Sequence, residues 1–233
     1  TERYFQLPGY EPVKAQEFVP RGGIPNLAAK FAAKKPLTVA CFAGGNHAQG
    51  GWFQTFVDDL GKRHPDVEIR GLLADIHGGA RGSGFSLYRF EHEVLRHKPD
   101  LIFVDFASDD TETNAESLWP TVEGIIRQAW HADPTTDLVF AYAFKTGMET
   151  DYAKGQCPGA VSAYERLADH YGVPSINMGY RVAAMARDGR LAIRATPEDA
   201  KQLADKPVFT NDGVYTSPAA NGIYARVVAE DLA

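Results

Sequence analysis

The sequence predicts an α/β protein whose parallel sheet is covered by helices on both faces. Short apolar segments bounded by Gly and Pro alternate along the chain with amphipathic segments of helical length. Strands that alternate with helices in this way are joined by crossover connections, and such connections produce parallel sheets buried between two helical layers. The fold class therefore follows from the order and the periodicity of the segments.

Each element is predicted from its own pattern. The strands are expected at residues 37–43, 67–73, 101–106, 137–143 and 174–177. The helices are expected at residues 52–63, 85–96, 115–130, 159–171 and 219–232. The first strand lies between Lys35-Pro36 and Gly44-Gly45, and these Pro and Gly residues mark its two ends. Pro120 is expected to occupy an early turn of its helix or to kink it.

Composition and charge exclude several classes of protein. The chain has 233 residues, 44% of them apolar and 23% charged, which excludes a disordered, collagen-like or coiled-coil protein. No apolar run approaches the roughly 20 residues of a membrane span, and the net charge of −6 argues against a nucleic-acid partner. Two cysteines, Cys41 and Cys157, make neither a disulfide framework nor a zinc site. The length fits one domain over residues 1–233, with 1–35 as an N-terminal extension packed on it.

Ligands of parallel sheets bind at the carboxyl ends of the strands, in the loops that lead to helices. This rule selects the polar residues that follow the first three strands, and the segment 211–221 before the last helix could reach the same edge. The resulting candidates are Asn46, His47, His77, Gly79, Arg81, Asp109, Asp110, Asp212 and Tyr215.

Four separated segments match one family in order. The segment 21–26, together with 36–45 and Gly51-Trp52, forms the first match; 95–106 (LRHKPDLIFVDF), the helix at 123–128 and Asp212-Gly213-Val214 follow. In these segments the chain resembles the SGNH (GDSL-like) hydrolases, most clearly a carbohydrate-esterase-like subgroup. The resemblance implies a flavodoxin-like three-layer sandwich with a five-stranded parallel sheet, and a carbohydrate as the substrate.

The catalytic positions of that family carry other residues here. The family expects a serine after the double glycine, an asparagine in its third block and a histidine in its last block. This chain has Asn46, Asp109 and Tyr215 there (Ser217 if two residues are inserted), and only Asp212 matches. Serine hydrolysis needs a hydroxyl nucleophile, a base and oxyanion donors. The sequence therefore favours a hydrolase with a different mechanism.

Glycosidic cleavage by two carboxyl groups is the favoured mechanism. Asp109 or Asp110 would supply one carboxyl and Asp212 the other, because adjacent acids raise each other's pKa and keep one protonated. His47 could serve as acid or base instead. The expected substrate-binding residues are Asn46, His77, Gly79, Arg81 and Tyr215. No cofactor is required, and the sequence indicates neither a compartment nor an oligomeric state.

Three alternatives remain open. The chain could be a catalytically inactive carbohydrate-binding protein. It could be an ester hydrolase with a relocated nucleophile, for which the candidates are Ser83, Ser86, Ser108 and Ser217. It could also bind a metal through His47, His77, Asp109 and Asp212.

Several of these residues also have plain structural interpretations. Asp109-Asp110 could form a turn or a helix cap, Asp212 an Asp-Gly turn, and Asp105 a structural carboxylate. Three aromatic residues could stack on sugar rings or pack in the core, namely Trp52, Trp119 and Tyr142.

Overall fold

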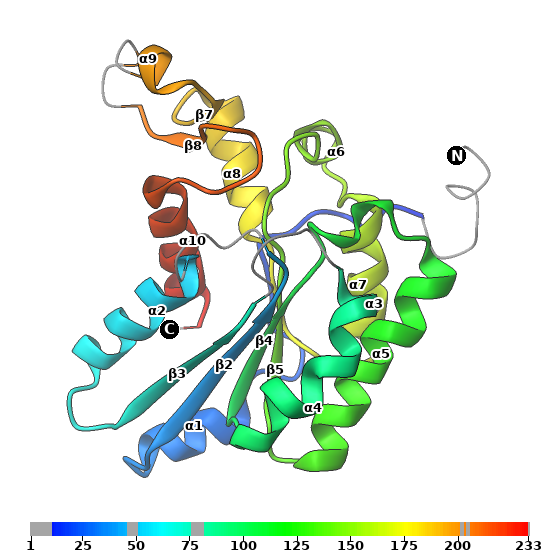
Figure 1. Cartoon of the computed structure of the whole chain (residues 1–233), viewed down its shortest axis with the longest axis vertical. Coiled ribbons are helices and arrows are strands. Elements are labelled where there is room, and N and C mark those ends of the chain that lie inside the picture. The colour runs from blue at the N-terminus through cyan, green and yellow to red at the C-terminus, as the bar shows by residue number, and fades with distance from the viewer. Residues whose placement is uncertain (1–10, 46–50, 76–81, 201–202, 204–205, 233) are drawn as a thin grey trace.

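A twisted sheet runs through the centre of the molecule, and helices cover both of its faces (Figure 1). The computed structural model describes residues 11–45, 51–75, 82–200, 203 and 206–232. Within them the main sheet has six strands in the order β1-β6-β5-β4-β2-β3. The strands are β1 (Phe18–Val19), β2 (Leu37–Ala43), β3 (Ile69–Ala74), β4 (Leu101–Asp105), β5 (Asp137–Ala141) and β6 (Ser175–Ile176).

The five strands from β6 to β3 are parallel, which confirms the predicted five-stranded parallel sheet. None of the predicted strands corresponds to β1, a two-residue strand that pairs antiparallel with β6 at one edge. Every residue of β4 and β5 is buried, as expected for strands covered on both faces. A separate two-stranded parallel sheet is formed by β7 (Ala192–Arg194) and β8 (Val208–Thr210).

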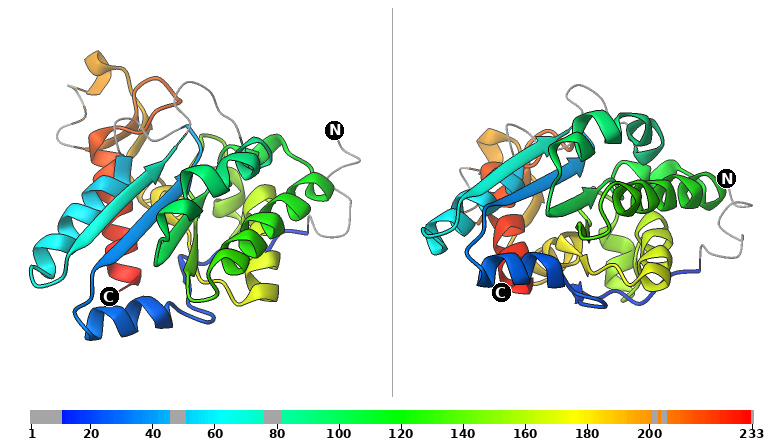
Figure 2. Two further views of the ribbon diagram at one scale, coloured as in Figure 1. Left: turned by 60° about the horizontal axis from the view of Figure 1, so that its bottom comes forward. Right: turned by 90° about the horizontal axis from the view of Figure 1, so that it is seen from below.

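Helices form two groups, one on each face of the sheet (Figures 1 and 2). On one side α10 packs against α2 and α8, and on the other α5 packs against α3 and α7. The α-helices are α1 (Pro25–Ala32), α2 (Gly51–Arg63), α3 (Ser83–Ser86), α4 (Phe90–Glu93), α5 (Ala115–Ala132), α6 (Glu149–Ala153), α7 (Gly159–Tyr171), α8 (Met178–Arg187), α9 (Pro197–Ala200) and α10 (Pro218–Asp231). Pro120 lies inside α5 without ending it. None of the described helices has the length and apolar character that a membrane crossing requires.

The predicted helix over residues 85–96 is a succession of short turns instead. Helices α3 and α4 alternate with the 3-10 segments η3 (Leu87–Arg89) and η4 (Leu95–His97). Phe90, Val94 and Leu95 are all buried, and Phe90 stacks on Phe42 at 4.7 Å between ring centroids. Consecutive residues of a straight α-helix point in different directions. The backbone leaves the helical geometry at Val94, where φ is −121°.

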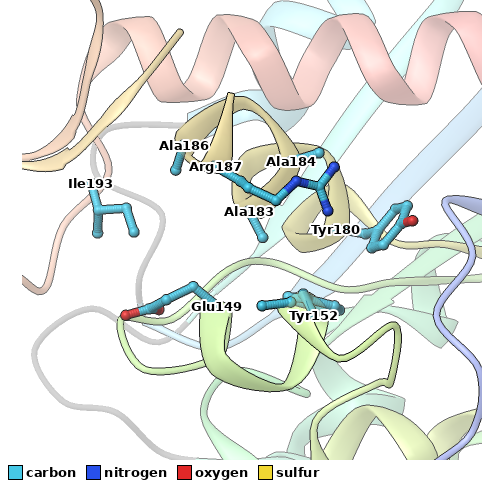
Figure 3. A pocket seen from close by; sticks show the side chains of 9 residues that line it. Glu149, Tyr152, Tyr180, Ala183, Ala184, Ala186, Arg187 and Ile193 are labelled. Atoms are coloured by element: carbon cyan, nitrogen blue, oxygen red, sulfur yellow. The ribbon is translucent and has the colours of Figure 1, made fainter. Parts of the chain in front are cut away.

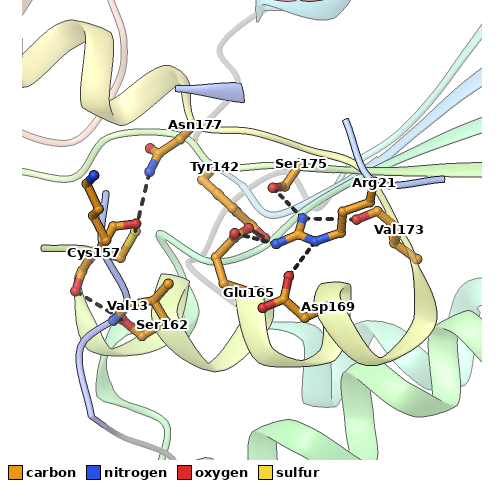
Figure 4. A network of polar contacts seen from close by, with 11 residues as sticks. Val13, Arg21, Tyr142, Cys157, Ser162, Glu165, Asp169, Val173, Ser175 and Asn177 are labelled. Carbon is orange, nitrogen blue, oxygen red and sulfur yellow. Dashed lines mark hydrogen bonds and ion pairs between the residues drawn. The ribbon is translucent and has the colours of Figure 1, made fainter. Parts of the chain in front are cut away.

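The N-terminal segment is fastened to α7 by a buried ion pair (Figure 4). The Arg21 guanidinium lies 2.6 Å from Glu165 and 2.6 Å from Asp169, and it donates to the Ser175 hydroxyl at 2.8 Å. Glu165 accepts a further hydrogen bond from Tyr142 at 2.7 Å. Because the Glu165 side chain is only 7% exposed, removing Arg21 would leave a buried carboxylate without its cation.

A carboxyl group near the C-terminus makes stability depend on pH. Burial, and then the neighbouring charge of Glu17, raise the pKa of Asp231 to about 6. Its Oδ2 atom is buried and has no hydrogen-bond partner among the described residues. The folded pKa lies above the unfolded value, so the native state loses stability as pH rises from about 4 past 6.

Asp231→Asn should therefore raise the free energy of unfolding above pH 6 by about 1 kcal/mol, a figure discounted for the partial exposure of the group. The variant and the parent should have equal stability below pH 4. Urea unfolding of both proteins at several pH values measures the difference. A constant difference across this range would show that Asp231 does not titrate as described.

Candidate functional site

The candidate site lies at the carboxyl ends of β2 and β4, where parallel sheets bind ligands. Of the predicted residues, the structure describes Asp109, Asp110, Asp212 and Tyr215. The other predicted residues lie outside the described residues, and they are Asn46, His47, His77, Gly79 and Arg81. The geometry of the site therefore rests on the two adjacent aspartates and on the turn before α10.

Asp110 is an internal anchor for three segments. Its side chain is 1% exposed, Oδ1 accepts from the backbone N–H of Ser83 at 3.0 Å, and Oδ2 accepts from the Tyr164 hydroxyl at 2.7 Å. Burial raises the pKa of Asp110, while these two hydrogen bonds oppose the rise. The group joins the loop after β4 to the start of α3 and to α7. Its buried position does not fit the prediction that Asp110 acts directly on a substrate.

Glycine at position 82 is required by the same anchor. A Cβ atom at Gly82 would overlap Oδ1 of Asp110. The φ angle of Gly82 is −67°, which any residue can adopt, so the requirement comes from space and not from backbone conformation. Neither Gly82 nor Tyr164 was among the candidate residues predicted from the sequence.

Asp109 is half-buried and lies against the end of β2. A Cβ atom at Gly44 would overlap the Asp109 carboxyl group. Gly44 is itself fixed, because its N–H donates to the carbonyl of Asp105 at 3.1 Å. A carboxyl group therefore stands directly beside the double glycine. A negative charge there would oppose the oxyanion of a serine-type reaction.

Asp105 has the structural role that the sequence analysis considered for it. It is 1% exposed and accepts from Trp52 Nε1 and from the N–H of Ala143, each at 3.3 Å. Trp52 and Tyr142 are 0% and 1% exposed, so the suggestion that they stack on sugar rings is wrong. They belong to the core, where Trp52 meets Phe103 edge to face.

Asp212 organises the turn before α10. Its Oδ1 accepts from the N–H groups of Val214 and Tyr215 at 2.8 and 2.9 Å, and from the Thr210 hydroxyl at 3.1 Å. The two backbone hydrogen bonds lower the pKa of Asp212, which keeps this exposed group ionised. The Asp-Gly turn is therefore present, and Gly213 has φ +89° as such a turn requires.

The turn also presents an exposed aromatic side chain. Tyr215 is 44% exposed. Helix α10 follows the turn, and its Tyr224 hydroxyl accepts from the N–H of Phe144 at 2.7 Å. The middle of α10 and the segment after β5 are thus held near one another.

The four candidate serines are buried or already bonded. Ser83 and Ser108 are 1% and 2% exposed. Ser86 donates to the carbonyl of Gly82, and the Ser217 hydroxyl caps α10 by accepting from the N–H of Ala220. Among the described residues, no cluster of three or more His, Cys, Asp or Glu side chains could hold a metal ion.

An apolar pocket of about 300 Å³ lies apart from these residues, between α6 and α8 (Figure 3). Tyr152, Tyr180 and the alanines of α8 line most of its wall. The described residues predicted for the site lie elsewhere, so this pocket plays no part in the geometry above.

Comparisons with known proteins support the fold. No protein-family model and no curated protein sequence matches the chain. A two-domain esterase active on acetylated mannans matches with a TM-score of 0.72 and 19% identity, over 93% of this chain and 54% of that one. An acetyl xylan esterase, AlAXEase, matches with a TM-score of 0.62 and 16% identity, over 84% of this chain and 100% of the other.

A third match is a protein of Parabacteroides merdae assigned to the GDSL-like lipases. Its TM-score is 0.63 and its identity 13%, over 85% of this chain and 96% of that one. The chain has the SGNH-hydrolase fold. This confirms the expectation drawn from the four sequence segments. The chain spans about half the length of the two-domain mannan esterase that it matches.

Proposed function

We propose that the chain is a carbohydrate-directed hydrolase that cleaves glycosidic bonds with carboxyl groups in place of a serine nucleophile. The position of the Asp109 carboxyl against Gly44, at the carboxyl ends of β2 and β4, carries this proposal. The substrate class is supported by the two-domain esterase, which is active on acetylated mannans and was crystallised with mannopentaose (TM-score 0.68, 20% identity).

Two carboxyl groups are assigned to the reaction. Asp109 donates its proton to the glycosidic oxygen, and the bond from that oxygen to the anomeric carbon breaks. Asp212, held ionised by the hydrogen bonds of its turn, accepts a proton from the water that attacks the anomeric carbon. Each product then carries a new hydroxyl group. Asp109 has lost one proton and Asp212 has gained one. Asp110 serves as the positioning residue that fixes the loop carrying Asp109.

Product analysis tests the reaction class. The full chain is incubated with acetylated and plain mannan and xylan oligosaccharides, and the masses of the products are measured by mass spectrometry. Shorter chains that each gain one water would support carboxylate catalysis. Loss of acetyl groups with intact chains would overturn it in favour of an esterase. Binding of the oligosaccharides without any product would favour the inactive carbohydrate-binding protein.

Substitutions at Asp212 separate its charge from its turn. Asp212→Asn keeps an oxygen that accepts from Val214 and Tyr215 but removes the base, so turnover should fall about 100-fold, at the low end for acid–base catalysis, because the group is exposed. Asp212→Ala removes the base and the hydrogen-bond acceptor, and it should also lower the melting temperature by a few degrees. Steady-state kinetics and thermal unfolding measure these effects. Unchanged turnover in Asp212→Asn would exclude Asp212 as the base.

A further inference from the structure

A second pocket lies next to the loop that carries the aspartates. Its volume is about 310 Å³, and it is bounded by η5 (Asp110–Glu112), the segment between β5 and α6, and the start of α7. Thr111, which follows Asp110 directly, lines it. One wall of the pocket therefore belongs to the loop that carries Asp109, and the volume of the pocket is at the small end of the range for ligand pockets.

Lys145 is the positive group of this pocket. Its Nζ donates to the Thr111 hydroxyl at 2.7 Å, and the side chain is half-buried. It forms no ion pair with any carboxylate in the described part of the chain. An ammonium group has three N–H donors, and the bond to Thr111 uses one. Two donors therefore remain for a ligand or for water.

The other walls supply acceptors and an apolar surface. Glu112 and Asp151 line the pocket together with Thr146, and the apolar part of its wall includes Met148 and Pro158. A sugar ring carries hydroxyl groups around its edge and C–H groups on its faces. It needs donors, acceptors and an apolar contact at once, and this combination is what the pocket offers.

We propose that this pocket binds one neutral pyranose unit of the substrate, with Lys145 and Thr111 hydrogen-bonded to its hydroxyl groups. The proposal rests on the proposed function, since the pocket would hold a second sugar unit of the same substrate and is lined by Thr111 of the loop that carries Asp109. The charges favour a neutral ring over a uronic acid, because Lys145 and Lys154, which pairs with Asp151 at 3.6 Å, only balance the carboxylates of Glu112 and Asp151. Lys145 then contributes to binding of the oligosaccharide and takes no part in bond cleavage.

Binding measurements on the full chain test the subsite without depending on catalysis. Mannopentaose, its shorter homologues and xylopentaose are titrated by calorimetry against the parent protein and Lys145→Met, which keeps most of the stem but removes the ammonium. Lys145→Met should weaken pentasaccharide binding about tenfold, and Thr111→Val should weaken it a few-fold. Lys35→Met makes the same change at an exposed residue beside the amino end of β2, and it should have no effect.

The outcomes separate this proposal from the proposed function. Cleavage by the parent with equal affinities in parent and Lys145→Met would overturn the subsite and leave the function standing. Binding that Lys145→Met weakens, without cleavage in the parent, would support the subsite and overturn glycosidic catalysis. Tighter binding of a mannuronate pentamer than of mannopentaose would overturn the neutral-sugar assignment. Failure of every oligosaccharide to bind the parent would overturn both proposals.

Discussion

Asp109→Asn is expected to lower the rate of glycosidic cleavage about 10³-fold, the middle of the range for loss of a general acid or base. The carboxyl group lies against Gly44, and an amide of the same shape fits the same space but carries no proton that it can donate as an acid. Asparagine is also the residue that the SGNH resemblance expects at this position, so the variant should fold. Steady-state rates on an oligosaccharide that the parent cleaves measure the effect.

The matched control is Asp66→Asn. It removes the same charge from an exposed carboxylate that pairs with Lys34 at 2.6 Å, in the loop that leads into the amino end of β3. Its turnover should equal that of the parent. If Asp109→Asn retained full turnover, Asp109 would not be the acid. If both variants lost activity equally, the cause would be the net charge of the protein and not the site.

Gly82→Ala is expected to reduce the free energy of unfolding by about 3 kcal/mol, the upper range for forcing an extra methyl group into packed structure. The new Cβ would overlap the Asp110 carboxyl, which is held by Ser83 and Tyr164 and cannot move without giving up a hydrogen bond. For a chain of this size the melting temperature should fall by about 8 °C. Urea and thermal unfolding measure both quantities.

Gly84→Ala is the control for that substitution. It lies two residues along the same turn of α3, and a Cβ atom there would meet nothing within 4 Å. The added methyl group should be neutral or slightly stabilising, because alanine loses less backbone entropy than glycine in a helix. Equal destabilisation of the two variants would show that the region resists any change. The anchor at Asp110 would then not be its cause.

Most of the sheet could be predicted from local sequence because its strands are continuous apolar runs between Gly, Pro and charged residues. β2 matches its prediction residue for residue, as does α7 among the helices. Helix α8 was missed, and its clearest signal is a cap: Asn177 accepts from the N–H of Tyr180. Such a cap is a weak pattern until the helix itself is known.

The site was harder to predict because its contacts join residues far apart in the chain. The position of Asp109 and Asp110 at the carboxyl end of the sheet could be predicted from the strand that precedes them. Their different environments could not, because Asp110 is bonded to Ser83, 27 residues before it, and to Tyr164, 54 residues after it. No periodicity in the sequence encodes such a pair. Asp110 is buried and Asp109 is only half-buried, and this difference arises from how the helices pack on the sheet.

The contacts between the N-terminal segment and α7 have a consequence for synthesis on the ribosome. Arg21 pairs with Glu165, 144 residues later, and the backbone of Val13 is bonded to Ser162, 149 residues later. While the first half of the chain emerges, these partners do not yet exist. The segment that becomes β1 therefore waits unpaired until α7 and β6 have been translated. Completion of this edge of the sheet is a late event, and a nascent chain released before residue 165 cannot form it.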